Sequence, residues 1–153
     1  MKVKRKSVVL LIAIFLLAPL TLFAWSGKVV SVMDGDTAKI VREDTGQQIK
    51  VRFAGIDSPE KKQAYGQAAR KYVNGLIAGK TVRVEPVATD RYGRTVGYIW
   101  LNDKEINLKI VAAGYAWMYR QYSPKPKRRA AKYHNAEASA KVRKAGLWND
   151  LNP

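Results

Sequence analysis

Two short acidic stretches contain the residues best suited to chemistry. They are MDGDTAKI at 33–40 and AGIDSPEKK at 54–62, which contain Asp34, Asp36, Asp57 and Glu60. Carboxylate oxygens without histidine or cysteine partners suit a hard cation, and Ca²⁺ in particular. A glycine between the two aspartates permits a tight bend that directs Asp36 inward, and Pro59 holds its neighbours in a defined turn. Either stretch alone is also typical of an ordinary turn, so the metal-site hypothesis requires that the fold bring both together.

Two arginines are placed where they could bind a phosphate. Arg52 lies on the polar face of the strand before DSPE, because Val51 and Phe53 alternate with it, and Arg94 opens the strand that follows TDRYG. A guanidinium group binds phosphate oxygens in pairs and keeps its charge, so it stabilises a phosphodiester that gains negative charge during attack. In so basic a chain either arginine is equally explained as a solvated surface residue, and only placement beside the carboxylates favours the phosphate-binding role.

Hydrophobic periodicity predicts the elements that must position these side chains. Apolar residues that alternate predict strands, and helical spacing predicts helices. We expect strands at 27–34, 36–43, 47–57, 80–87 and 93–101, and helices at 61–79, 104–114 and about 124–145. Pro86 predicts an edge or a bulge, Ser123 a helix N-cap, and Gly146 the end of the last helix. This order predicts an α+β fold that is mainly β, a five-stranded OB-fold barrel with about three helices.

The composition restricts the partners. The 153 residues suit one domain, and 28 Lys+Arg against 12 Asp+Glu give a formal net charge of +16. This charge favours nucleic acid or an anionic membrane surface as partner, although a merely soluble basic surface is also compatible. The basic run at 125–132 is interpreted as a solvated helix face or as an extension of a nucleic-acid track. The absence of cysteine excludes disulfides, thiolate metal sites and a cysteine nucleophile.

The beginning of the chain predicts export. The positive segment MKVKRK precedes the apolar run SVVLLIAIFLLAPLTLFA, which ends in a small residue. This pattern is typical of a secretory signal peptide, here residues 1–24 with cleavage near Ala24, followed by a domain at 25–153. A secreted or periplasmic protein is therefore expected. An uncleaved anchor remains the alternative, because Leu22 is larger than the residue usually found three positions before cleavage, and it would give a membrane-anchored form.

Three motifs resemble the signature stretches of the staphylococcal nuclease (thermonuclease) family. They are VSVMDGDTAKI, VRFAGIDSPE and TDRYGRTVGYIW, and the later LKIVAAGYAW and AEASAKVRKAGLW fit the helices of that family. The resemblance runs from about Gly27 to Trp148. Residue by residue, it implies calcium-binding carboxylates at Asp36 and Asp57, a backbone carbonyl ligand at Ser58, a catalytic set of Arg52, Glu60 and Arg94, and nucleotide-pocket residues at Tyr92 and Tyr122. Arg120 stands where the best-known member has a second pocket tyrosine.

The resemblance implies a function as well. It indicates a Ca²⁺-dependent endonuclease, a phosphodiesterase that hydrolyses DNA and RNA with low sequence specificity and leaves 3′-phosphate ends. The expected substrate is single-stranded or locally open nucleic acid, and the expected state is a monomer without a stable membrane partner unless the N-terminal segment is retained. The alternative is a non-catalytic OB-fold module that binds nucleic acid or a protein. The presence of both metal carboxylates, Glu60 and both arginines favours the enzyme, because a binding module gains little from keeping all five.

Overall fold

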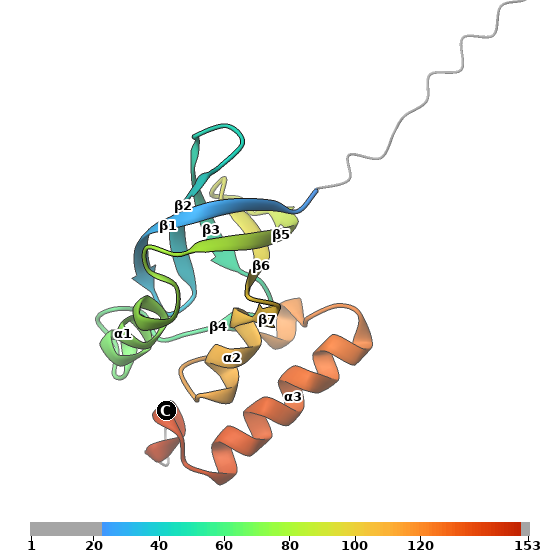
Figure 1. The fold of residues 1–153 in the computed structure, drawn as a ribbon. Helices are drawn as coiled ribbons and strands as arrows, with labels where there is room; N and C mark the ends of the chain where they lie inside the picture. Colours follow the sequence, from blue (N-terminus) through green and yellow to red (C-terminus); the bar gives the residue numbers. More distant parts are fainter. Residues whose placement is uncertain (1–22, 151–153) are drawn as a thin grey trace, which may run out of the picture.

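The computed structural model describes residues 23–150 as a β-barrel flanked by helices (Figure 1). The barrel strands are β1 (Trp25–Asp34), β2 (Thr37–Arg42), β3 (Gln48–Phe53), β5 (Thr81–Thr89) and β6 (Thr95–Leu101). Three further strands have two residues each, namely β4 (Ile56–Asp57), β7 (Lys104–Glu105) and β8 (Trp117–Met118). The helices are α1 (Gly66–Ile77), α2 (Ile106–Ala112) and α3 (Lys127–Val142), with short 3₁₀ turns at Arg120–Tyr122 and Gly146–Asn149.

Strand pairing closes the barrel. β1, β2 and β3 form an antiparallel meander, β5 pairs with β1, and β6 pairs with β5. A parallel pairing of β3 with β6 completes the ring, with Val51 opposite Thr95 and Arg52 opposite Val96. The prediction of a five-stranded OB-type barrel with three helices is confirmed. Pro86 lies at a shift in the β5–β6 register, which is the bulge that its missing N–H predicts.

The core fills the barrel and continues under the helices. Val29, Ile40, Val51 and Ile99 are fully or almost fully buried within it. Below the barrel α2 packs between the sheet and α3, while α1 covers the side next to β1 (Figure 1). The buried Asn107 of α2 ties the closing seam together, because its amide nitrogen donates to the Ala54 and Gly97 carbonyls and its oxygen accepts from the Ile99 N–H. Every polar group of this side chain is therefore satisfied in the interior, which makes its burial tolerable.

The structure corrects several predicted boundaries. The expected strand at 47–57 is interrupted at Ala54–Gly55, and the helix expected from residue 61 begins at Gly66. The helix expected at 104–114 begins at Ile106, because the two preceding residues pair with β6 as β7. The last helix begins at Lys127 without a side-chain cap, so Ser123 is not its N-cap. A proline disfavours helical backbone in the residue before it, and Pro126 therefore prevents an earlier start.

The N-terminal prediction falls almost wholly on residues that the structure does not describe. Of the expected export segment 1–24, only residues 23 and 24 lie within the described range. Between residues 23 and 150, no helix combines the length and the apolar character needed to cross a membrane.

Candidate active site

The β1–β2 corner places Asp36 in the interior next to the β3–β4 corner. Asp36 is only 6% exposed, and its carboxylate accepts hydrogen bonds from the Ser58 N–H at 2.8 Å and from the Thr37 hydroxyl at 3.0 Å. Its own carbonyl accepts from the Phe53 N–H at 2.8 Å. The antiparallel register that sets Thr37 opposite Arg52 produces this meeting. The two acidic stretches therefore come together, as the metal-site hypothesis requires.

Gly35 is required for this contact by space rather than by an unusual backbone angle. A Cβ at this position would lie 2.6 Å from the Ser58 hydroxyl oxygen and 2.8 Å from the Ala69 Cβ. Real Cβ atoms essentially never approach so closely, so any larger residue would push the corner away from α1 and from Ser58. Gly35 thus allows the first acidic stretch to pack against the second.

Arg52 joins the two carboxylates. Its Nη2 lies 2.8 Å from Asp57 Oδ1 and 3.3 Å from Asp36 Oδ2. Its Nη1 donates to the carbonyls of Phe53 and Ile56 at 3.0 and 2.9 Å. The side chain leaves the core face as the alternation of β3 predicts, yet it is only 14% exposed because the corner folds back over it. Arg52 is thereby held in one position by both side-chain and backbone acceptors.

Burial dominates the electrostatics of this corner. Loss of hydration raises the pKa of Asp36 to about 7, although the charge of Arg52 acts in the opposite direction. Burial likewise raises the pKa of Asp57, with Arg52 again opposing the shift and the charges of Asp34 and Glu60 adding to it. At both carboxyl groups the loss of hydration therefore outweighs the attraction of Arg52.

The oxygen atoms at this corner fit a hard cation. The Ser58 hydroxyl is buried and has no hydrogen-bond partner among the described residues, and it lies beside two carboxylates that reach the same guanidinium nitrogen. No group of three or more His, Cys, Asp or Glu side chains able to hold a metal ion occurs within residues 23–150. Ca²⁺ accepts two carboxylates supplemented by carbonyl, hydroxyl and water oxygens as ligands. Zn²⁺ prefers histidine and cysteine and does not match this set.

A groove of about 850 Å³ opens next to the corner. Arg52 and Asp57 line it from one side, and Asp90, Tyr92 and Arg94 line it from the β5–β6 turn. The segment after β8 supplies further polar and aromatic lining, namely Tyr119, Gln121, Tyr122, Ser123 and Lys125. The groove thus combines guanidinium groups, a carboxylate and exposed aromatic rings on one surface.

Arg94 is held in the groove by its own turn. Its Nε donates to Asp90 Oδ2 at 2.6 Å and its backbone N–H donates to Asp90 Oδ1 at 2.9 Å, while its guanidinium lies 5.5 Å from the centre of the Tyr92 ring. Burial alone would raise the pKa of Asp90, but the hydrogen bonds and the charge of Arg94 outweigh it and lower this pKa. The parallel β3–β6 pairing brings this turn to the groove that Arg52 lines.

Glu60 lies at the exposed rim of the acidic corner. Burial is the main cause that raises the pKa of Asp57, and the charge of Glu60 adds to this shift. Its backbone is fixed by a hydrogen bond from its N–H to Gln63 Oε1, and by one from the Gln63 N–H to its carbonyl. Gly66 permits the tight return of the chain, because a Cβ there would overlap the Glu60 carbonyl oxygen. The side chain itself remains in solvent.

Of the three residues predicted to bind the nucleotide, two line the groove and one does not. Tyr92 and Tyr122 line the groove and are 68% and 66% exposed. Arg120 is not among the groove-lining residues, and it points toward α3, where its Nη2 lies 3.4 Å from Glu137 Oε2. Tyr119 lines the groove in its place, with its ring 5.4 Å from that of Tyr122. The sequence reasoning missed Tyr119, although an aromatic residue adjacent to Arg120 was a visible signal.

Fold and site together define a class of protein. A closed OB-type barrel holds a buried acidic corner, and three arginines and four tyrosines line a groove beside it. The family described as "Staphylococcal nuclease homologue" matches residues 50–150, which include Arg52, Asp57, Glu60 and Arg94. The chain belongs to this family. The Asp36 corner precedes the matched residues, and strand pairing places it at the site.

Similar proteins cover most of the chain. A protein of Haemophilus influenzae named "Uncharacterized endonuclease" is 40% identical over 126 residues, which are 82% of this chain and 67% of that protein. An Escherichia coli O157:H7 protein of the same name is 38% identical over 145 residues, 88% of this chain and 90% of that protein. The "Micrococcal nuclease" of Shigella flexneri is 36% identical over 141 residues, 84% of this chain and 78% of that protein.

Proposed function

We propose that this protein is a Ca²⁺-dependent nuclease, a phosphodiesterase that cuts DNA and RNA within the strand. The observation that carries the proposal is the meeting of Asp36 and Asp57 on Arg52, at the edge of a groove that Arg94 also lines. The family and the names of the similar proteins support the same activity. A module that only bound nucleic acid would gain little from keeping the buried carboxylate of Asp36 together with Asp57, Glu60 and both arginines.

In this proposal Asp36 and Asp57 hold the ion, with the Ser58 backbone as a further ligand. When bound, Ca²⁺ supplies positive charge that polarises the scissile phosphate. Arg52 and Arg94 bind the phosphoryl oxygens and stabilise the charge that grows on them, and Asp90 and the backbone carbonyls keep both guanidinium groups oriented in advance. Because these groups are already ordered, little reorganisation accompanies the reaction.

Glu60 acts on the attacking water. Its carboxylate accepts a proton from the water as the oxygen attacks phosphorus, and its exposed position at the rim leaves room for that water. The bond between phosphorus and the 5′ oxygen breaks, and the leaving oxygen takes a proton from solvent water. One fragment then carries a 3′-phosphate and the other a 5′-hydroxyl. Glu60 thus accepts the proton, and the two arginines stabilise the negative charge.

The aromatic residues of the groove bind the nucleotide without strict selection. Tyr92, Tyr119 and Tyr122 expose rings on which a base can stack, and every base has such a face. Phosphate contacts from arginine and lysine likewise carry no sequence information. These properties favour single-stranded or locally open DNA and RNA as substrates and low sequence specificity. We expect the protein to act as a monomer.

Export is the second part of the proposal. The basic and apolar residues at 1–24 support secretion or transport to the periplasm, with retention as a membrane anchor as the alternative. N-terminal sequencing of the protein recovered from culture medium, periplasm and membranes distinguishes the two. A mature terminus near Trp25 in a soluble fraction supports export with cleavage.

A digestion assay tests the activity. Purified protein is expected to degrade single-stranded DNA and RNA with Ca²⁺ present, to stop when EGTA is added, and to produce ends that accept no extension until their 3′-phosphate is removed. Equal degradation in EGTA contradicts the proposed metal dependence. Binding to both nucleic acids without any cleavage, in Ca²⁺ as in EGTA, supports the non-catalytic binding module instead.

A further inference from the structure

Two groups of basic residues lie on and near α3. Arg129 is only 17% exposed and pairs with Glu85 and Glu105, Lys141 pairs with Glu137, and Arg143 donates to the Ala112 carbonyl. The second group lies at the start of the helix, is exposed, and forms no ion pair or side-chain hydrogen bond within residues 23–150. It consists of Lys125, Lys127, Arg128 and Lys132, which we call the α3 cationic surface.

Within residues 23–150 no acidic side chain forms an ion pair with this surface. Glu85 and Glu105 bind Arg129, and Glu105 also accepts from the Tyr133 hydroxyl, while Glu137 binds Arg120 and Lys141. The first turn of α3 contains no acidic residue, so its cations face the positive end of the helix dipole without compensation. Such an arrangement opposes folding, and a bound polyanion relieves it.

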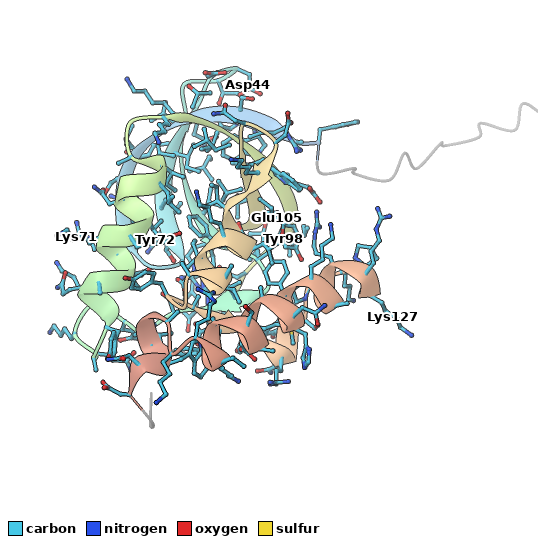
Figure 2. The ribbon with its side chains drawn as sticks, turned by 60° about the horizontal axis from the view of Figure 1, so that its bottom comes forward. Asp44, Lys71, Tyr72, Tyr98, Glu105 and Lys127 are labelled. Carbon is cyan, nitrogen blue, oxygen red and sulfur yellow. The ribbon has the colours of Figure 1, made fainter. Side chains whose placement is uncertain are left out.

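The α3 cationic surface is continuous with the groove. Lys125 belongs to both, and its N–H donates to the hydroxyl of Tyr98, another groove-lining residue, at 3.3 Å. The guanidinium of Arg129 lies 3.9 Å from the centre of the Tyr98 ring, which locks the first turns of α3 onto the barrel. In Figure 2 Tyr98 and Glu105 lie between barrel and helix, whereas Lys127 lies at the outer end of α3. The position of this surface relative to the groove is therefore fixed.

We propose that the α3 cationic surface binds the phosphate backbone of the strand that leaves the groove, as an accessory site for long polynucleotides. This inference rests on the proposed nuclease function. Six helical residues from Lys127 to Lys132 extend over roughly 9 Å, which adds phosphate contacts beyond those made at the scissile bond. The site binds any sequence, because lysine and arginine contact only the backbone.

Substrates of two lengths separate this surface from the groove. The test variant combines Lys127→Gln, Arg128→Gln and Lys132→Gln and leaves Lys125 in the groove intact. The control variant combines Lys28→Gln, Lys50→Gln and Lys71→Gln, which removes the same charge from exposed positions on β1, β3 and α1. Both are assayed against a 16-nucleotide single strand and a dinucleotide, with Kd for the long strand measured by fluorescence anisotropy and folding checked by Tm.

We expect the test variant to raise the Kd and KM of the 16-nucleotide strand roughly 10- to 100-fold at 0.1 M salt, because three phosphate contacts are lost. The slope of log Kd against log salt should fall by about 2. Dinucleotide hydrolysis and the control variant should stay within about twofold of the unmodified protein, because general electrostatic attraction changes far less than direct contact. A long strand bound equally well by the test variant and the unmodified protein overturns the inference.

Other outcomes are equally decisive. An equal loss in the control variant overturns the inference in favour of net charge alone. Normal strand binding by the test variant, together with lost binding to vesicles of phosphatidylserine and phosphatidylcholine, overturns it in favour of a membrane surface. If the unmodified protein binds the strand without cutting it and the test variant loses that binding, the accessory site stands and the nuclease proposal fails.

Discussion

Two regions of the site differ in how their side chains are held. They are the acidic corner, formed by Asp36, Asp57 and Arg52, and the aromatic wall of the groove, formed by Tyr92, Tyr119 and Tyr122. At the corner Asp36 is 6% exposed, and both it and Arg52 are held by several hydrogen bonds from separate elements. On the wall Tyr92 and Tyr122 are 68% and 66% exposed, and their rings contact mainly neighbouring arginine and tyrosine side chains. One region is fixed before any ligand arrives, and the other leaves large surfaces free.

This difference matches two physical tasks. Stabilising a transition state requires charges whose positions are set in advance, because a small misplacement weakens their effect on the reacting phosphate. Binding strands of any sequence requires only accessible rings and cations, which tolerate variation in the ligand. We therefore expect changes at the corner to lower kcat, and changes at the wall to raise KM.

The largest expected effect is at the rim of the acidic corner. Glu60→Gln removes the group proposed to take the proton from water and should lower kcat roughly 10²- to 10⁴-fold with KM little changed. Asp44→Asn removes an exposed carboxylate from the β2–β3 turn, which Figure 2 shows at the end of the barrel away from α3, and should leave kcat unchanged. A single-turnover rate for Glu60→Gln equal to that of the unmodified protein would show that proton transfer is assigned to the wrong residue.

The aromatic wall should show the opposite kinetic signature. Tyr119→Ala or Tyr122→Ala removes a ring on which a base stacks, worth about 1–3 kcal/mol per base, and should raise KM roughly 10-fold or more while kcat changes little. Tyr122→Phe keeps the ring and should retain most of the affinity. Equal losses for phenylalanine and alanine would mean that the hydroxyl, and not stacking, makes the contact.

The smallest effect concerns the residue that orients Arg94. Asp90→Asn should lower kcat by less than Glu60→Gln does, because Arg94 keeps its charge but loses a fixed orientation. The cost in stability should be about 0–1 kcal/mol, since the pair is partly exposed. Steady-state kinetics and chemical denaturation measure the two effects. A kcat loss as large as that of Glu60→Gln would place Asp90 in direct contact with the reaction.

The pH dependence of the Asp90–Arg94 pair follows from the lowered pKa of Asp90. Because the folded value lies below the unfolded one, the pair stabilises the protein above the unfolded pKa of about 3.9. That contribution is lost as the pH falls through the lower folded pKa. Asp90→Asn should therefore be less stable than the unmodified protein at neutral pH and equally stable well below pH 3.9. A stability difference that persists in strong acid contradicts this account.

Local patterns predicted most of the elements but not their ends. Alternation along each strand predicted the barrel, and helical spacing predicted the helices. Both patterns depend on which face of an element is buried. Ser123 failed as a cap because Pro126 moved the start of α3, and the break at Ala54–Gly55 depends on closure of the barrel. The sequence predicted Arg120 as a pocket residue, whereas Tyr119 lines the groove and Arg120 Nη2 lies 3.4 Å from Glu137 Oε2, because the 3₁₀ turn at Arg120–Tyr122 sets the directions of these side chains.

The sequence by itself determined the kind of chemistry: carboxylates in two turns, arginines at strand ends, a strongly basic composition and strands of alternating character. These are properties of residue types and short-range periodicity. Only the tertiary structure decided that Thr37 pairs with Arg52, that β3 lies beside β6, and that Arg52 joins both acidic corners. Strand register and barrel closure depend on contacts between residues far apart in the sequence, which pack into a shared core. No short stretch of sequence specifies them by itself.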